Sequence, residues 1–131
     1  MFWKSRSHFS VKVTPGWYLA WGCTEDLSDI IWRDDKVAIA RFQPAFSRTG
    51  RFVVAGDIWF SNRTELMRGF DFNRQDAYPK TDIEILACLW EIKGIEALNF
   101  LEGMFAFAVW DREREELWLG RDRVGSRTLY Y

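Results

Sequence analysis

Gly103-Met104-Phe105-Ala106-Phe107-Ala108-Val109-Trp110-Asp111 is the stretch of this sequence that decides the fold. Within it, Met104–Trp110 is apolar throughout and predicts a strand. The charges of Asp111–Glu116 alternate in sign, which is typical of a solvated turn. Leu117–Arg121 predicts a second strand, so the two apolar segments form a predicted hairpin.

Upstream of this hairpin, Thr81-Asp82-Ile83-Glu84 has the composition of a helix start, with a capping Thr and a Glu three residues later. The helix is expected to continue to about Lys93, with Gly94 as its C-terminal cap. Its apolar residues recur at helical spacing: Ile85, Leu86, Leu89 and Ile92. Ile95–Leu101 predicts a second helical stretch, which stops near Gly103.

Further upstream, Phe52–Phe60 is almost continuously apolar and predicts a strand buried on both faces. Gly56 interrupts it, and glycine inside a strand marks either a bulge or the close approach of another group. Asn62 is expected to cap a helix, because Glu65 stands three residues later. Pro44–Arg51, before the strand, is predicted to be a loop.

Near the N-terminus, Phe9–Val13 and Trp17–Trp21 predict a hairpin around the turn Thr14-Pro15-Gly16. β-Branched residues favour a strand at Lys36–Phe42, whereas Glu25–Asp35 has no clear pattern. Strands in two groups around a helical pair predict an α+β layered fold. The whole chain, residues 1–131, is expected to be a single domain.

Composition excludes several functional classes. The 18 basic and 19 acidic residues are interspersed, which gives no reason to expect nucleic acid as a partner. No apolar run is long enough for membrane insertion, and the first residues lack a signal-peptide core, so a cytoplasmic protein is expected. Cys23 and Cys88 are too few and too separated for a disulfide framework or a metal site, and no cofactor is expected.

Three groups of motifs resemble the N-terminal glutamine amidotransferase domain of the asparagine synthetase family. The motifs agree in order and spacing, and the resemblance is strong over residues 50–131 and weak before them. The quoted residues are Ala55-Gly56-Asp57-Ile58-Trp59 with Asn62-Arg63-Thr64-Glu65-Leu66; Thr81-Asp82-Ile83-Glu84; and Gly103–Asp111 with Arg121-Asp122-Arg123-Val124-Gly125 and Leu129-Tyr130-Tyr131.

This resemblance implies an N-terminal-nucleophile-hydrolase-like fold, in which two antiparallel sheets lie between outer helices. It also implies a chemistry that needs a Cys directly after the initiator Met, whose freed amino group acts as base for its own thiol. An Asn side chain and a Gly backbone N–H then stabilise the oxyanion. Further strands follow the Leu129-Tyr130-Tyr131 segment in the family, so the domain is expected to be truncated at its C-terminus.

Transferred residue by residue, the catalytic pattern is incomplete. Phe2 stands where the nucleophile is required, and Ala55 stands at the position of the oxyanion Asn. What is retained is a vestigial glutamine pocket of Gly56, Asp57 and Asp82. No catalytic residue is therefore expected in this chain.

Alternative roles stay open for several residues. Ser5, Ser7 or Ser10 could replace the thiol only if processing made one of them the first residue. Arg41 lies in roughly the region of the family's glutamine-binding Arg, without its sequence context. Structural roles are expected for Asp82 as a first-turn helix residue, for Gly56 as a bulge, and for Asp122 and Gly125 in a turn.

The missing thiol is typical of a cysteine-free branch that includes β-lactam synthetases and lasso-peptide cyclases. There a C-terminal domain activates a carboxylate with ATP, and an amine in the substrate closes the amide. The pyrophosphate-binding Ser-Gly-Gly-x-Asp-Ser loop of that domain does not occur in this sequence. The first hypothesis is therefore a non-catalytic scaffold domain that supports a synthetase domain absent from this chain.

The second hypothesis is a free-standing protein–protein interaction module or assembly subunit derived from the same fold. Its expected partner is another protein chain or a second copy of this one. The candidate interface is the strand edge at Leu129, Tyr130 and Tyr131, because open apolar edges invite pairing. The eight Trp of the chain also favour an interface, where Trp is enriched.

Overall fold

The computed structural model describes residues 2–5, 9–12, 18–21, 29–72 and 79–123 of the chain. In the first three of these segments the description is of the backbone, with Leu19 the exception. The described residues form two antiparallel sheets and two α-helices, which confirms the α+β class. None of these helices is long and apolar enough to span a membrane.

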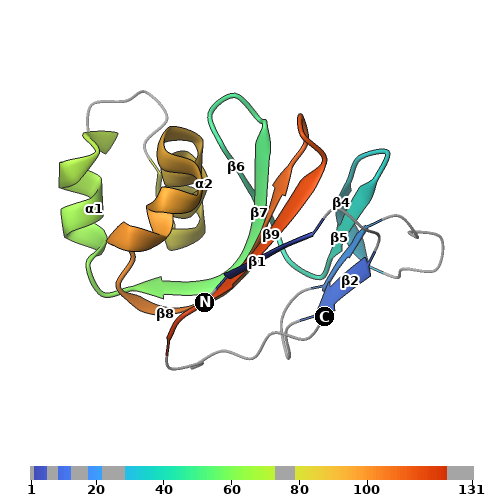
Figure 1. Ribbon diagram of the computed structural model, residues 1–131, viewed down its shortest axis with the longest axis horizontal. Helices are drawn as coiled ribbons and strands as arrows, with labels where there is room; N and C mark the ends of the chain where they lie inside the picture. Colours follow the sequence, from blue (N-terminus) through green and yellow to red (C-terminus); the bar gives the residue numbers. More distant parts are fainter. Residues whose placement is uncertain (1, 6–8, 13–17, 22–28, 73–78, 124–131) are drawn as a thin grey trace.

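The larger sheet has five strands and contains the hairpin predicted from the apolar stretch. Strands β8 and β9 pair with each other, β7 pairs with β8, and the two edges are short strands (Figure 1). The order across the sheet is β1 (Phe2–Ser5), β9 (Glu116–Arg121), β8 (Gly103–Asp111), β7 (Phe52–Phe60) and β6 (Ala45–Phe46).

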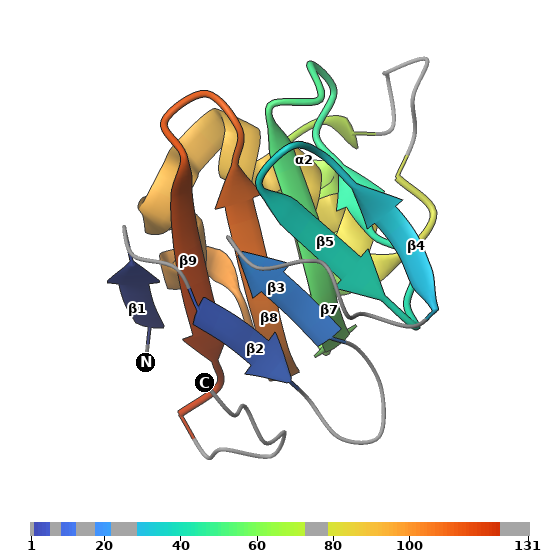
Figure 2. The same cartoon turned by 90° about the vertical axis from the view of Figure 1, so that its right-hand side faces the viewer.

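The smaller sheet has four strands of four residues each. It contains the predicted N-terminal hairpin, and its order is β2 (Phe9–Lys12), β3 (Tyr18–Trp21), β5 (Val37–Ala40) and β4 (Ile30–Arg33). Figure 2 shows this sheet in front of the larger one, with its strands crossing the strands behind at an angle. The two sheets bury a common cluster that includes Ile39, Ala55 and Trp110.

The helices cover the other face of the larger sheet, as Figure 1 shows. They are α1 (Arg63–Gly69) and α2 (Asp82–Lys93), and α2 continues as the 3-10 helix η2 (Gly94–Phe100). The capping box is present at Thr81 and Glu84, and Gly94 has a positive φ of 58° at the C-cap, as predicted. A second cluster, which includes Leu86, Trp90 and Phe107, fills the space between helices and sheet.

Several expectations were wrong in detail. The predicted loop Pro44–Arg51 contains the two-residue strand β6. Strands β4 and β1 lie in segments for which no element was predicted. The short edge strands have too few residues to show an alternating pattern. Ile92 points away from the core and is 53 % exposed, and Cys88 is only partly buried. The predicted turn at Thr14-Pro15-Gly16 lies outside the described residues.

The expectation that β7 is buried on both faces holds for only part of its length. Val53, Val54 and Ala55 are fully buried, whereas Trp59 is 50 % exposed. The short strands of the smaller sheet explain this difference, because they cover the first half of β7 and leave Trp59 outside the cluster between the sheets. One end of the larger sheet is therefore open on that face.

Candidate functional site

Four positions of the larger sheet form one row across its strands. Phe2 pairs with Gly120, Gly120 pairs with Phe107, and Phe107 pairs with Gly56. Adjacent strands lie about 4.8 Å apart, so the backbones of Phe2 and Gly56 are separated by roughly 14 Å. Two strands, β9 and β8, thus lie between Phe2, where the resemblance requires a nucleophile, and Gly56.

The two glycines of this row make room for one aromatic ring. A Cβ on Gly120 would lie 2.4 Å from Cζ of Phe107, and a Cβ on Gly56 would lie 2.7 Å from its Cβ. Pairing between β7 and β8 is continuous through Gly56, so the residue marks a close approach and the expected bulge was wrong. Gly56 and Gly120 are therefore both needed for the same reason, because a side chain at either position would collide with Phe107.

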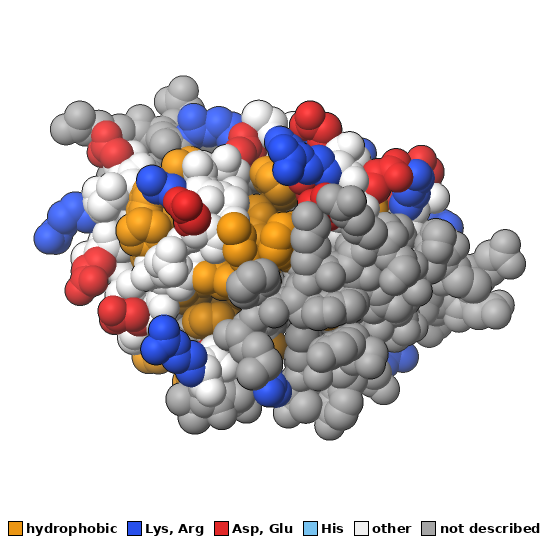
Figure 3. Space-filling model, viewed as in Figure 1, with side chains coloured by type: hydrophobic (Ala, Val, Ile, Leu, Met, Phe, Trp, Pro, Cys, Tyr) orange, Lys and Arg blue, Asp and Glu red, His pale blue; other side chains and the backbone are white. Residues whose placement is uncertain are grey.

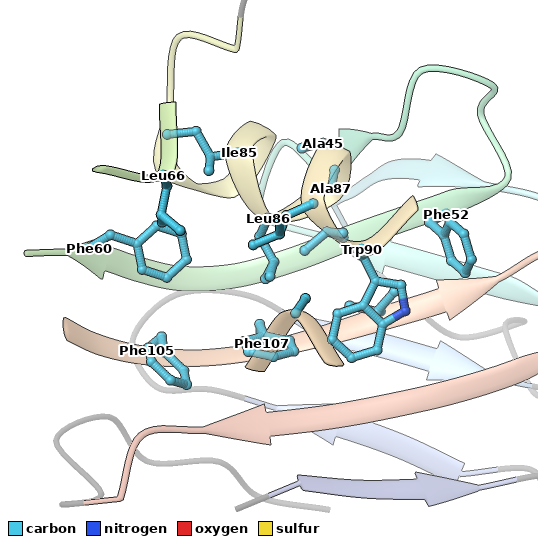
Figure 4. Packing of buried hydrophobic residues seen from close by; sticks show 14 of the residues in the cluster. Ala45, Phe52, Phe60, Leu66, Ile85, Leu86, Ala87, Trp90, Phe105 and Phe107 are labelled. Carbon is cyan, nitrogen blue, oxygen red and sulfur yellow. The ribbon is translucent and has the colours of Figure 1, made fainter. Parts of the chain in front are cut away.

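An aromatic cluster covers this row on the helix side of the sheet. Figure 4 shows Trp90 of α2 and Phe107 of β8 pointing toward one another. Their ring centroids are 5.9 Å apart in an edge-to-face arrangement, and Trp118 lies 6.0 Å beyond Trp90. Such pairs add about 0.5–1.5 kcal/mol to the area that they bury. The space beside Gly56 is occupied by the core.

Ala55 and Asp57 belong to the opposite face of β7. Ala55 is fully buried in the cluster between the two sheets, and its methyl group offers no hydrogen-bond donor. Asp57 alternates with Gly56 and so lies on the same face as Ala55. It is partly buried and has an interaction partner. Asp57 and Gly56 therefore face opposite sides of the sheet, although they are neighbours in β7.

Asp82, the third residue of the vestigial pocket, connects three elements. Its Oδ2 accepts a hydrogen bond of 2.9 Å from the backbone N–H of Phe60, at the end of β7. Its Oδ1 lies 3.3 Å from the Arg63 guanidinium, which also donates to the carbonyl of Lys80. The carboxylate is 12 % exposed and stands in the first turn of α2, where the helix dipole favours negative charge.

Asn62 has a role that its sequence context did not indicate. It occupies the N-cap position of α1, yet its side chain makes no capping hydrogen bond. Instead its amide donates to the carbonyl of Phe100 at 2.7 Å and accepts from the N–H of Glu102 at 3.2 Å. The predicted cap was therefore wrong, because these distant backbone groups take both hydrogen-bonding atoms of the amide.

The remaining predicted residues lie apart from this region or outside the description. Arg41 has a positive φ of 66° and lies 3.6 Å from the carboxylate of Asp29. Ser5 pairs with Leu117 on β1, and Ser10 lies on β2. Desolvation raises the pKa of the Cys88 thiol, which disfavours the reactive thiolate. The residues outside the described ranges are Ser7, Cys23, Gly125, Leu129, Tyr130 and Tyr131.

An open groove of about 730 Å³ lies where η2, the start of β8 and the end of β9 meet. Asp122 is buried beside it and is bonded to Phe105 in both directions, with its Oδ2 accepting from the Phe105 N–H at 3.0 Å. This confirms a structural role for Asp122. No sequence pattern indicates the groove, because its walls come from segments about 25 residues apart that only the β8–β9 pairing brings together.

A charged network occupies the other end of the larger sheet. Arg51 donates two hydrogen bonds, of 3.0 and 2.9 Å, to the carboxylate of Asp111. Asp34 accepts from the Trp110 indole at 3.0 Å and from two backbone N–H groups of its own turn. In the described part of the chain, no three metal-ligating side chains come together.

The described chain has two antiparallel sheets with helices on one face of the larger sheet, and the motif residues lie along β7, β8 and β9 and at the starts of α1 and α2. Residues 34–131 match the family described as "Glutamine amidotransferase domain", and the chain belongs to this family. Its relatives place it more narrowly, with the N-terminal glutamine amidotransferase domains of the asparagine synthetase family.

One relative is asparagine synthetase B [glutamine-hydrolyzing] of Escherichia coli strain K12. It is 33 % identical over 90 residues, which are 67 % of this chain and 16 % of the relative. A putative asparagine synthetase of Methanocaldococcus jannaschii is 27 % identical over 110 residues, 84 % of this chain and 19 % of the relative. The chain thus spans less than a fifth of the curated relatives it matches.

Proposed function

We propose that this chain is a non-catalytic glutaminase-like domain that supports the synthetase domain of an ATP-dependent amide ligase. Phe2 carries the proposal, because it stands where the family chemistry needs a thiol. Without that nucleophile no covalent glutamyl intermediate forms. Ala55 adds to this loss, since one oxyanion donor is worth about 3 kcal/mol of barrier in hydrolases.

The retained residues support the proposal because each has a structural partner. Gly56 accommodates Phe107, and Asp82 joins α2 to the end of β7 and to Arg63. A glutamine amine that approached Asp82 would compete with both of these contacts. The domain thus keeps the residues that hold the fold and lacks those that perform the reaction.

The finer fold assignment belongs to the same proposal. The described order of layers is helices, five-stranded sheet and four-stranded sheet (Figures 1 and 2). We assign it to the N-terminal-nucleophile-hydrolase sandwich, which supplies the scaffold without its nucleophile. The free thiol of Cys88 fits a reducing compartment such as the cytoplasm.

Glutamine hydrolysis tests the catalytic part of the proposal. The purified chain is incubated with glutamine, and glutamate is assayed, with the Escherichia coli relative as positive control. We expect no glutamate above that of a boiled sample. Turnover that a thiol-directed glutamine analogue inhibits would contradict the proposal.

A double variant tests whether the lost side chains alone explain the inactivity. Phe2→Cys with Ala55→Asn restores both family side chains. We expect it to remain inactive, because two strands lie between position 2 and Gly56, and Phe107 occupies the row between them. Glutamate production by this variant would show that the scaffold still holds a competent site.

A protein–protein interaction module is the second candidate function. Exposed apolar side chains on both sides of the sheet support it, among them Trp59, Met104 and Phe100. Trp and Met are enriched in interfaces. Co-purification distinguishes the two functions: a synthetase domain as partner supports the scaffold, and self-association alone supports the module.

A further inference from the structure

The groove beside η2 lies between the helical layer and the open end of the five-stranded sheet. Its volume of about 730 Å³ falls within the usual range for small-molecule sites, roughly 300–1,000 Å³. Figure 3 shows hydrophobic side chains on the face that Figure 1 presents, with charged side chains on the same face. The groove lining combines the two kinds, with Leu98, Leu101 and Phe105 beside Glu96 and Glu102. This combination of apolar floor and charged rim is typical of ligand sites.

The floor of the groove is apolar. Leu98 and Leu101, from η2 and the segment after it, are partly buried against the helix-side cluster. Phe105 of β8 is 7 % exposed and closes the bottom. Its ring belongs to an aromatic series with Phe60 and Phe107, which fixes its position. A hydrocarbon chain or a ring therefore fits this floor.

The rim of the groove is mainly acidic. Glu96 of η2 and Glu102 are both exposed there. Within the described residues, neither carboxylate has a hydrogen bond or an ion pair; Glu102 bonds to Asn62 and Ser61 through its backbone groups alone. The buried carboxylate of Asp122 lies below them. Asp122 has partners of its own, so the available charge is that of Glu96 and Glu102, which have no counter-ion among the described residues.

Two arginines also reach this groove, and both must be weighed against the acids. Arg121 alternates with Gly120 on β9, so its side chain belongs to the face opposite the helices, and it has another interaction partner. Arg123 is exposed at the rim, two residues beyond the end of the strand. Among the described residues at the rim, the two carboxylates of Glu96 and Glu102 therefore outnumber the one cation of Arg123.

We propose that this groove binds a small organic cation, an ammonium or guanidinium group carried on a hydrocarbon body. The cation lies at Glu96 and Glu102, and the hydrocarbon lies on Leu98, Leu101 and Phe105. The groove lining does not include Gly56, Asp57 or Asp82, so binding there does not depend on the loss of glutaminase activity.

Three probes of equal length test the proposal: hexylamine, hexanol and hexanoate. Binding is followed on the full chain by backbone amide chemical shifts in NMR spectra. We expect hexylamine to bind most tightly, with shifts centred on Asn99, Glu102 and Phe105, and its affinity to fall as salt is added. The double variant Glu96→Gln/Glu102→Gln should weaken hexylamine about five- to tenfold and leave hexanol unchanged.

Two single variants complete the test. Glu65→Gln removes an exposed acid from α1, away from the groove, and should leave hexylamine binding as it was. Arg123→Ala removes the opposing charge and should strengthen hexylamine about two- to threefold. Preferential binding of hexanoate, equal binding of all three probes, no binding of any, or shifts centred elsewhere would each overturn the proposal. Should the double variant fail to fold, the three probes on the parent chain still decide between these outcomes.

Discussion

At one end of the five-stranded sheet, where β8 finishes, charged side chains pair across strands; at the other, where β8 begins, glycine and backbone groups hold the structure. The first end has the Arg51–Asp111 pair and the Asp34–Trp110 hydrogen bond. The second has Gly103, with a φ of 143°, and the groove with Glu96 and Glu102 at its rim. Both ends belong to one strand, Gly103–Asp111.

This contrast shows where the fold leaves room for function. Asp111 is almost fully buried, and Arg51 and the N–H groups of Glu113 and Arg114 satisfy its carboxylate, which is therefore not available to a ligand. At the groove, polar backbone groups are satisfied internally, and the carboxylates of Glu96 and Glu102 stay available. One sheet therefore has an end where Asp111 is fully paired and an end where two carboxylates remain available.

The largest expected effect is at the open end, in Gly103→Ala. A Cβ on Gly103 would lie 2.0 Å from the carbonyl oxygen of Trp59, and its φ of 143° is strained for any side chain. Neither the backbone of β7 nor that of β8 can move without breaking the Phe60–Gly103 pairing. We expect a loss of about 3 kcal/mol or more in the free energy of unfolding, measured by urea denaturation.

Gly69→Ala is the matched control for that substitution. Gly69 is the last residue of α1, its φ is negative, and a Cβ there would meet nothing within 4 Å. Alanine should therefore stabilise the protein by about 0.4–1 kcal/mol. If both glycine variants lost the same amount, the strain assigned to the open end would be wrong.

Strand β8 and the two glycines Gly103 and Gly56 show what the sequence could and could not predict. The apolar run from Met104 to Trp110 was enough to place β8, because burial on both faces leaves no alternation to misread. The strain at Gly103 and the ring contact at Gly56 depend on which strand lies beside them. Strand pairing across 40 or more residues sets those contacts, and local sequence does not encode it.

The next effect is at the paired end, in Asp111→Asn. Burial alone would raise the pKa of Asp111, but the Arg51 guanidinium and the N–H groups of Arg114 and Glu113 outweigh it and hold that pKa below its ordinary value. The resulting stability is present above the unfolded-state pKa and is lost as the pH falls below about 4. We expect the variant to lose about 2–3 kcal/mol at pH 7.

The pH dependence distinguishes this pair from simple packing. The stability difference between parent and variant should shrink as the pH falls from 5 toward 2, when the parent carboxylate takes up a proton. Glu113→Gln, which removes an exposed partner 3.3 Å from Arg51, should cost less than about 0.5 kcal/mol. A difference that stays constant over this pH range would contradict the assignment to charge.

The candidate site was less predictable than the fold. The family motifs identified Gly56, Asp57 and Asp82 as a group, yet the structure puts Gly56 and Asp57 on opposite faces of β7. Residue type and spacing cannot show this, because a motif records positions along one strand and a site is assembled across several. Asn62 illustrates the same limit, since its partners at Phe100 and Glu102 are about 40 residues away.

The smallest expected effect concerns Asp82, back at the open end. In Asp82→Asn the amide oxygen can still accept from the N–H of Phe60, so the variant loses only the ion pair with Arg63 and the interaction with the helix dipole. We expect a loss of about 1 kcal/mol. Asp82→Ala also removes the acceptor of the Phe60 N–H and should lose about 1–3 kcal/mol more.

Because both roles of Asp82 are structural, glutamine should raise the melting temperature of neither the parent chain nor Asp82→Asn. A glutamine-dependent shift in the parent that disappears in Asp82→Asn would show that this end of the sheet still holds a glutamine pocket. The end where β8 begins would then have two ligand sites, the glutamine pocket and the proposed groove for an organic cation.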